Sequence, residues 1–508
     1  MSNTGQRLRR PTREEIQKMA RRNFLTLTDE QVEEFEDILD ATMEFYERIE
    51  QYDDPRHDHT YEERTIGPRP TDDDPHNAVI TRCRVPGAAD GPLAGYNVGV
   101  KDNFAVAGLP MTCGSRILDD YVAAWDATVV KRLLSTGADI TAKLNMEPFA
   151  ISASGEQSLG GPVINPRDED RLAGGSSSGS GAAVAAGIVD VAIGTDSGGS
   201  IRIPADWCGC VGLKPTYGLV PETGVIGMAP TMDHVGPIAR TARNCALTLE
   251  AIAGHDPLDP RGRHVETEPY ADALSTDLDD LSIALLTEGF DRETSDERVD
   301  ETVRSATRAF EAAGADVTDV SVPGHERAPD LHKGIVIEAL AAFWRSESAG
   351  WFTRRLYDVE FATALGKARR AMGDDLPPAL QVNIIAGQYL TEQYHGRYHA
   401  KAQNLAQNLH GAYESAFEDV DLLVLPTTPI LPHERRMDLS RSDLIRRGRI
   451  MLDNTTPFDV TGHPAASVPC GIIDGLPVGM QIVGPDFDEA TVLRACHALE
   501  AKLDLKLD

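Results

Sequence analysis

The chain has 508 residues, and its 80 acidic against 49 basic side chains give a formal net charge of −31. A surface this acidic repels phosphate backbones, which argues against nucleic-acid binding through a basic face. A chain of this length buries enough surface to fold without a metal ion or a disulfide. We interpret the charge as a halophilic, salt-adapted surface. An acidic protein from an ordinary habitat is the alternative, and neither interpretation bears on the chemistry.

The seven cysteines follow no disulfide or metal-binding pattern. Their number is odd, and Cys208 and Cys210 lie too close together for the usual pair of zinc ligands. We therefore expect free thiols in a reducing cytoplasm and no metal ion. The polar residues 1–22 hold no apolar core for a signal peptide, and no apolar run reaches the roughly 18 residues of a membrane span. The sequence thus predicts a cytoplasmic protein without membrane contact.

Residues 1–78 are predicted to form a helical N-terminal extension whose last part, 51–78, is a polar linker. Thr12 with Glu15, and Thr28 with Gln31, have the spacing of capping boxes, which satisfy the free N–H groups at a helix start. After the second box, apolar residues recur every three or four positions and form one stripe. The stripe consists of Val32, Phe35, Leu39, Met43 and Tyr46. It fits a helix packed on its own core or, as the alternative, an arm that closes a symmetric homodimer.

Residues 79–508 are predicted to form an α/β domain with a sheet between layers of helices. Short apolar runs typical of strands alternate with helical stretches, which is the pattern of such a sheet. The strand-like runs are 97–100, 139–142, 189–194, 281–286, 316–322, 422–425, 466–469 and 479–483. The helical stretches include 127–136, 180–186 and 296–313. A more variable α/β and helical region spans about 255–420, and its last part is mainly helical by periodicity.

Two segments rich in glycine and serine, 174–181 and 194–204, lie beside apolar runs. Glycine is favoured where the backbone adopts a positive φ or approaches a ligand closely, so both segments are predicted to be tight loops. A phosphate-binding loop is one alternative, but the Lys followed by Ser or Thr that such a loop needs is missing. A flexible linker is the other alternative, and the neighbouring apolar runs disfavour it.

The serines of these loops are candidates for a nucleophile, and a serine hydroxyl needs a base to act as one. No Gly-x-Ser-x-Gly elbow with a histidine partner lies near them, which leaves a Ser–Lys arrangement. Lys101 follows the apolar run 96–100 and could be the base if burial leaves its amine neutral. A structural lysine paired with an aspartate is an equally good interpretation of this residue.

Three motifs occur in order along the chain: Val-Lys-Asp at 100–102, Gly-Gly-Ser-Ser-Ser-Gly-Ser at 174–180 and Gly-Gly-Ser-Ile-Arg-Ile-Pro at 198–204. Their order and spacing resemble those of the amidase signature family. The resemblance is strong over about 91–241 and resumes at 420–429 and 456–484. It implies the family's α/β fold, a large central mixed β-sheet covered by helices on both sides. It also implies the hydrolysis of a carboxamide to a carboxylic acid and ammonia, with no cofactor.

The resemblance assigns catalytic roles to three residues. Ser200 resembles the family nucleophile, and Ser176 resembles the bridging serine, which the family holds after a cis peptide bond. Lys101 resembles the base, which draws the proton of Ser200 through Ser176. This Ser-Ser-Lys triad would form an acyl-enzyme intermediate with a small-molecule amide.

The same resemblance implies an oxyanion hole of backbone N–H groups in the loop around the nucleophile. The expected donors are those of Ser197, Gly198, Gly199 and Ser200. An ion pair between Asp196 and Arg202 would order this loop. The residues that could line the acyl pocket are Met228, Ile226 and Met451, although packing in the core is the more frequent role for such side chains.

Within the family two interpretations compete. The N-terminal helices and residues 221–233 resemble bacterial aliphatic and aromatic amidases, which are dimers joined through such helices, so we expect a homodimer. The alternative is the A subunit of an amidotransferase, which releases ammonia from glutamine for tRNA-dependent amidation and needs partner subunits. A catalytically inactive protein on this fold is a third possibility, which the presence of the whole triad disfavours.

Overall fold

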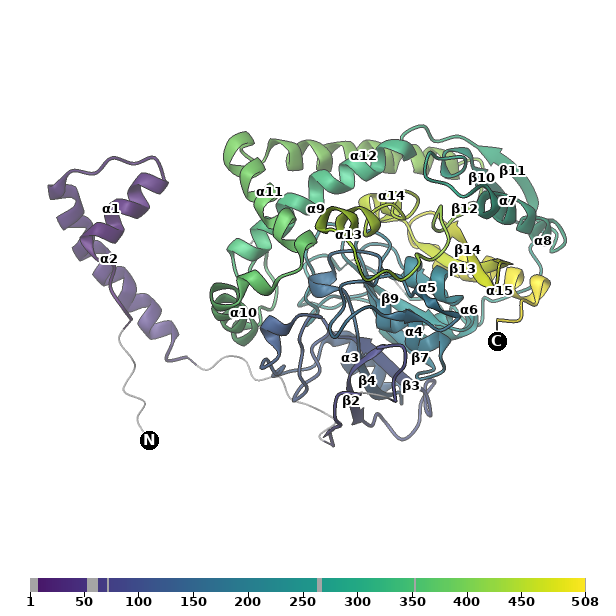
Figure 1. Cartoon of the computed structure of the whole chain (residues 1–508), viewed down its shortest axis with the longest axis horizontal. Coiled ribbons are helices and arrows are strands. Elements are labelled where there is room, and N and C mark those ends of the chain that lie inside the picture. The colour runs from purple at the N-terminus through teal and green to yellow at the C-terminus, as the bar shows by residue number, and fades with distance from the viewer. Residues whose placement is uncertain (1–7, 53–62, 71–72, 263–266, 351–352, 508) are drawn as a thin grey trace. The chain divides into compact units, whose positions relative to one another are not determined.

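The structure is a computed structural model and describes residues 8–52, 63–70, 73–262, 267–350 and 353–507. It divides into two compact units, Met1–Asp58 and His59–Asp508, which are drawn in chain-order colours in Figure 1. The boundary between the units falls within the predicted linker 51–78. The first unit therefore contains the predicted helices, and the second contains both Gly/Ser loops.

Two helices make up the described part of the first unit: α1 (Arg13–Arg22) and α2 (Asp29–Ile49). Both begin at the predicted capping boxes, with Thr12 and Glu15 closing one box and Thr28 and Gln31 the other. Arg13 also donates to Glu36 at 2.8 Å, so a charged contact joins the two helices.

The apolar stripe of α2 is only partly covered within the first unit. Val32 is buried, at 2% exposure, and packs in the same small core as Ile16 and Ala20 of α1. Phe35 and Tyr46, in contrast, are 36% and 55% exposed. The expectation of a helix packed on its own core therefore holds fully only for Val32, since Leu39 and Met43 are partly buried.

A sheet of twelve strands runs through the second unit in the order β1-β2-β4-β3-β7-β9-β8-β13-β14-β12-β10-β11. Strand β3 is parallel to β4 and β7, and β10 is parallel to β11 and β12, whereas pairs such as β7–β9 and β13–β14 are antiparallel. The sheet is therefore mixed, as the family resemblance implies. The strands are β1 Thr65–Ile66, β2 Val79–Val85, β3 Asn97–Lys101, β4 Asp139–Leu144, β7 Val191–Asp196, β8 Val211–Lys214, β9 His234–Ala239, β10 Ser282–Leu286, β11 Asp316–Val320, β12 Leu422–Pro426, β13 Ala465–Ile473 and β14 Leu476–Val483, and a separate small sheet pairs β5 Ile164–Asn165 with β6 Asp168–Leu172.

Helices cover both faces of this sheet, and accordingly every residue of β7, β9 and β14 is buried. One group packs in series, α3 on α6 and α6 on α15, while α4 packs on α5. Helix α9 packs against both α11 and α12, and Figure 1 shows these three together. The helices are α3 Thr128–Ser135, α4 Ser178–Ala185, α5 Arg202–Cys208, α6 Ala242–Ile252, α7 Glu297–Ala306, α8 Arg308–Glu311, α9 Ala328–Arg345, α10 Val359–Ala371, α11 Pro378–Tyr394, α12 Arg397–Phe417, α13 Arg441–Arg447, α14 Thr456–Thr461 and α15 Glu489–Leu503.

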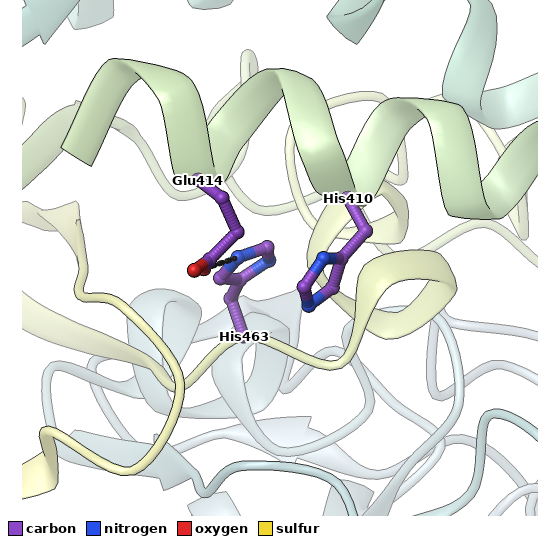
Figure 2. A group of neighbouring side chains, drawn as sticks. All are labelled: His410, Glu414 and His463. Carbon is purple, nitrogen blue, oxygen red and sulfur yellow. Dashed lines mark hydrogen bonds and ion pairs between the residues drawn. The ribbon is translucent and has the colours of Figure 1, made fainter. Parts of the chain in front are cut away.

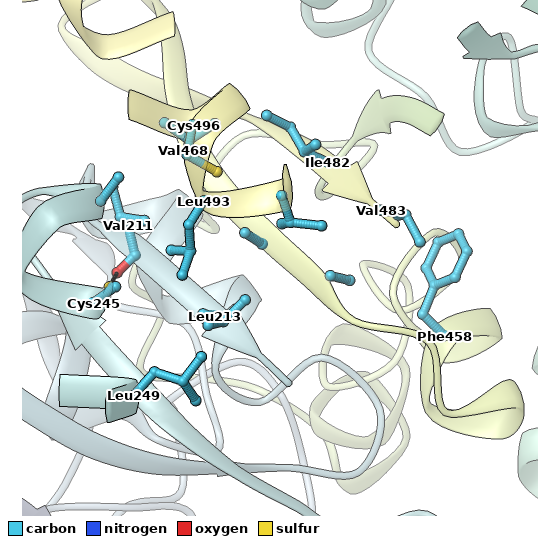
Figure 3. Close-up of a cluster of buried hydrophobic side chains, with 14 of the residues drawn as sticks. Val211, Leu213, Cys245, Leu249, Phe458, Val468, Ile482, Val483, Leu493 and Cys496 are labelled. Carbon is cyan, nitrogen blue, oxygen red and sulfur yellow. Dashed lines mark hydrogen bonds between the residues drawn. The ribbon is translucent and has the colours of Figure 1, made fainter. Parts of the chain in front are cut away.

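The largest apolar cluster extends along most of the sheet, and Figure 3 shows the part of it where α6 and α15 pack near β8. Val211 and Leu213 of β8 are completely buried in it, together with Leu249 of α6 and Leu493 of α15. Burying one side chain of this kind stabilises a fold by about 1.5–3 kcal/mol. The cluster thus holds β8 in place, and β8 directly follows helix α5.

The fold brings the predicted site residues to neighbouring element ends. Strands β3 and β7 are adjacent and parallel, and they end at Lys101 and Asp196. Helices α4 and α5 begin just after Ser176 and Ser200 and pack on each other. Because the carboxyl ends of parallel strands meet at one edge of a sheet, all four side chains gather there.

All seven cysteines are free thiols, as predicted, and six of them are buried. Burial raises the pKa of Cys210 to about 12, so this thiol stays protonated near neutral pH. Within the described ranges, no helix has the length and apolar character needed to cross a bilayer.

Gly179, in the first turn of α4, has no room for a side chain. A β-carbon there would lie 2.2 Å from the carbonyl oxygen of Ala78 and 2.5 Å from the amide nitrogen of Asn145. We predict that Gly179→Ala lowers the free energy of unfolding by about 1–3 kcal/mol, measured by denaturant titration. The control is Gly373→Ala, where nothing lies within 4 Å of the added carbon. Equal losses in the two variants would contradict the packing argument.

Candidate active site

Lys101 ends β3 in a completely buried position, with 0% exposure. Its Nζ lies 2.8 Å from Ser176 Oγ and 2.8 Å from Thr195 Oγ1, and 3.4 Å from the carbonyl oxygen of Thr195. Burial lowers the pKa of Lys101 to about 7, although the more distant charge of Asp196 opposes the shift. A large share of the amine is therefore neutral near pH 7.

The aspartate that follows Lys101 in the sequence pairs with a different lysine. Asp102 forms a fully buried ion pair with Lys143 at 2.7 Å and accepts hydrogen bonds from Thr112. No carboxylate of the described chain lies within 4.0 Å of Lys101 Nζ. The interpretation of Lys101 as a structural lysine paired with an aspartate is therefore wrong, and Lys143 has that role.

The two predicted serines lie at different depths. Ser176 follows a cis peptide bond from Gly175, as the family resemblance implies, and is completely buried. Ser200 is 9% exposed and lines a cavity. The amide of Ser177 donates to the carbonyl oxygen of Ser200 at 3.3 Å, which joins the two loops through the backbone. Among the described residues, no hydrogen bond of 3.5 Å or less joins the hydroxyls of Ser176 and Ser200.

The predicted pair of Asp196 and Arg202 is present and fully buried. Arg202 donates from Nε and Nη2 to the two carboxylate oxygens of Asp196 at 3.0 and 3.1 Å. It also donates to Asp459 at 2.7 Å and to Gln481 at 2.7 Å. Burial by itself raises the pKa of Asp196, but the charge of Arg202 outweighs this and holds the pKa well below its usual range. The nucleophile loop is thus tied to α14 and β14.

Two of the four expected oxyanion donors point at Asp196 instead of the cavity. The amides of Gly198 and Gly199 donate to Asp196 Oδ1 at 3.3 and 2.5 Å. The amides of Ser197 and Ser200 form no hydrogen bond within the described part of the chain. They are therefore the two amides of this loop that remain for a ligand oxygen.

Three residues that the sequence analysis missed hold the same loop from outside. His332 Nε2 donates to the carbonyl oxygen of Ser197 at 2.8 Å, and Thr455 Oγ1 donates to that of Gly198 at 2.6 Å. Asp233 accepts from the hydroxyl of Ser197 at 2.5 Å. Burial lowers the pKa of His332 to about 4, so its ring stays neutral. These residues come from distant parts of the chain and carry no local sequence signal.

The cavity beside Ser200 has a volume of about 380 Å³ and suits a small molecule. Met228 lines it, as predicted, but Met451 and Ile226 are not among its lining residues. Met451 is buried in a small cluster with Trp207, whereas Ile226 packs against a different apolar cluster. The other apolar lining residues include Ile151, Val336, Ile337, Ala379, Ile450 and Leu452. The basic lining residues are Lys333, Arg446 and Arg449.

Comparison with known proteins assigns the chain to a family. The model of the Amidase family matches residues 76–493, so the chain belongs to this family, the amidase signature enzymes. It is therefore an enzyme that acts on C–N bonds.

The similar proteins include both amidotransferase A subunits and an amidase. The A subunit of the glutamyl-tRNA(Gln) amidotransferase of Halobacterium salinarum is 40% identical over 432 residues, which cover 84% of this chain and 99% of the relative. The enantioselective amidase of Rhodococcus rhodochrous is 38% identical over 487 residues, which cover 93% of this chain and 92% of the relative. The solved structure of the A subunit of the glutamyl-tRNA(Gln) amidotransferase from Thermotoga maritima has a TM-score of 0.71 at 30% identity, covering 84% of this chain and 88% of that one.

Removing the guanidinium of Arg202 leaves Asp196 buried without its counter-charge. We predict that Arg202→Met lowers the free energy of unfolding by about 3–5 kcal/mol, or abolishes soluble expression. Arg240→Met is the control, because Arg240 and Asp190 form a pair whose side chains are 46% and 37% exposed. That variant should lose at most about 1 kcal/mol. Comparable stability of the two variants in denaturant titration would show that the buried pair does not hold the loop.

Proposed function

We propose that the chain is an amidohydrolase that cleaves a carboxamide to a carboxylic acid and ammonia. In this proposal Ser200 is the nucleophile, Ser176 the bridge and Lys101 the base. The observation that carries it is the contact of 2.8 Å between the buried amine of Lys101 and the hydroxyl of Ser176. A neutral amine in this position can accept a proton, whereas an ion-paired lysine cannot.

The reaction then proceeds in two halves. The Ser176 hydroxyl gives its proton to Lys101 and takes that of Ser200, while Ser200 Oγ attacks the amide carbon. The reverse transfer delivers a proton to the leaving nitrogen, the C–N bond breaks, and ammonia departs from an acyl-enzyme. Water repeats the sequence and releases the acid. The relay requires the hydroxyls of Ser176 and Ser200 to come into hydrogen-bond contact when substrate binds, since such contacts often tighten only in the complex.

The loop that precedes Ser200 is proposed to stabilise the charge on the carbonyl oxygen. The amides of Ser197 and Ser200 are the direct donors, and a donor of this kind contributes about 3 kcal/mol to the transition state. The amides of Gly198 and Gly199, by binding Asp196, keep the loop in shape. Asp196 and Arg202 act as positioning residues that touch no substrate.

The alternative function is that of the A subunit of an amidotransferase, which releases ammonia from glutamine for tRNA-dependent amidation. The relatives with that name support it, and so do the three basic side chains of the cavity wall, which could bind a substrate carboxylate. The amidase interpretation is supported by the larger share of the chain that aligns with the enantioselective amidase, 93% against 84%. Assays of the purified chain separate the two. Turnover of benzamide or propionamide without partner subunits favours the amidase, whereas turnover of glutamine alone favours the alternative.

We also propose a domain organisation for the chain. Residues 79–508 form the catalytic domain, with about 255–420 shaping the acyl side of the cavity, and 1–78 form an extension. The exposed part of the apolar stripe on α2, which includes Phe35 and Tyr46, supports a homodimer joined through the N-terminal helices. A monomer in solution at micromolar concentration would contradict this assembly.

The nucleophile assignment predicts a loss of activity without a loss of fold. Ser200→Ala should lower the rate of amide hydrolysis by on the order of a thousandfold or more, because no other hydroxyl can form the acyl-enzyme. Ser180→Ala is the control from the other Gly/Ser-rich segment, since the Ser180 hydroxyl, in the first turn of α4, is buried and has no hydrogen-bond partner among the described residues. It should leave the rate within about twofold of the parent. Hydrolysis that survives in Ser200→Ala would rule out this serine.

The lowered pKa of Lys101 predicts the pH dependence of the reaction. The neutral amine is the active form, and its fraction rises as the pH rises through about 7. We therefore expect kcat/KM to fall about tenfold for each pH unit below 7 and to level off above about pH 8. Initial rates measured between about pH 5.5 and 9 test this. A profile that is flat down to the acidic end would contradict a titrating lysine base.

A further inference from the structure

Two histidines and a glutamate come together away from the cavity, on α12 and in the loop between α14 and β13. His410 and Glu414 lie one turn apart on α12, and His463 lies in the loop opposite them, as Figure 2 shows. One ligand atom from each side chain lies within 4.8 Å of those of the other two. The His463 side chain is fully buried, whereas those of His410 and Glu414 are 32% and 44% exposed. None of the three lines the cavity at Ser200.

Both ring nitrogens of His463 lie within hydrogen-bond distance of an oxygen. Nδ1 lies 2.8 Å from the hydroxyl oxygen of Thr461, and that hydroxyl lies 3.0 Å from the carbonyl oxygen of Pro457, to which it can donate. In the tautomer with its proton on Nδ1, His463 donates to Thr461. The lone pair of Nε2 then points at Glu414 Oε1 from 2.9 Å.

In that tautomer a cation between Nε2 of His463 and Oε1 of Glu414 satisfies both acceptors, and a metal ion can take this place. Imidazole ligands of metals usually donate from their second nitrogen to an oxygen, which is the contact that His463 makes with Thr461. Asp486 likewise accepts from Nε2 of His410 at 3.2 Å, and such carboxylate–histidine pairs accompany metal ligation.

We propose that His410, Glu414 and His463 form a binding site for a divalent metal ion of the zinc type. Two imidazoles and a carboxylate are a common zinc ligand set, and the partial exposure of His410 and Glu414 leaves room for a water molecule as fourth ligand. Zinc–nitrogen bonds of about 2.0 Å place tetrahedral donors roughly 3.3 Å apart. Binding therefore moves the half-exposed His410 toward the other two and opens its ring stack with His463, whose centroids lie 4.6 Å apart.

The ion would have a structural role. It would tie α12 to the loop after α14, whose carbonyl oxygen at His463 already accepts from Lys214 at 2.6 Å. Helix α14 carries Asp459, which binds Arg202 of the nucleophile loop. The metal ion thus stabilises the frame behind the active site and takes no part in the reaction, so this inference stands independently of the proposed function.

The test uses the full chain without a histidine tag, dialysed against a chelator and then given zinc chloride. After removal of unbound metal, we expect about one zinc ion per chain by elemental analysis, a submicromolar Kd by calorimetry and a higher midpoint of thermal unfolding. Magnesium chloride should give none of these effects, because Mg²⁺ prefers oxygen ligands.

Three variants locate the ion. His410→Asn and Glu414→Gln alter partly exposed side chains and should fold, while weakening zinc binding by at least about tenfold. Glu418→Gln, one turn further along the same acidic helix end, is the matched control and should bind like the parent. A parent chain that retains no zinc overturns the proposal, and so does zinc binding that His410→Asn and Glu414→Gln leave unchanged, because the metal then sits elsewhere on the acidic surface.

Discussion

The burial of the Lys101 amine beside the Ser176 hydroxyl is the constraint on which the rest of the site depends. A lysine in a dry position stays neutral only if no carboxylate approaches it, because an opposite charge favours the ammonium form. The chain meets this requirement through a second buried lysine: Lys143 takes the carboxylate of Asp102, which directly follows Lys101. Thr195 completes the arrangement with a neutral hydroxyl at 2.8 Å. The ion pair of Asp102 and Lys143 thus holds this carboxylate away from the base, whose pKa is lowered by burial.

The nucleophile loop shows a second use of buried charge. Asp196 and Arg202 lie within a few residues of Ser200, yet the guanidinium also binds Asp459 and Gln481, which come from the far end of the chain. This network carries no reaction step. It fixes the backbone of the loop, so that its free amides point in a set direction before substrate arrives, and such preorganisation is what makes an oxyanion site effective. The proposed metal site would brace the same helix, α14, at its C-terminal end.

Local chemistry explains what could be predicted from the sequence. Strand β3, strand β7 and helix α4 were expected because apolar runs and glycine-rich turns mark them. At Gly179 the reason for glycine is the backbone of Ala78 and Asn145, which packs against the helix, and not a ligand. Strands β8 and β9 were not predicted, since Gly212 and Pro237 interrupt their short apolar runs. Residues such as His332 and Thr455 could not be found, because only the folded chain brings them to the loop. The direction of individual amides is likewise a property of φ and ψ, and no residue type reveals it.

The protonation state of Lys101 is the most direct test of this mechanism, and ¹³C NMR of the lysine ε-carbons follows it as a function of pH. Comparison with Lys101→Met, which lacks that signal, identifies the resonance among the ten lysines. We predict that it titrates with a midpoint near the pKa of about 7 that burial gives this side chain. A signal that remains that of an ammonium group up to about pH 9 would contradict the claim that the base is neutral at rest.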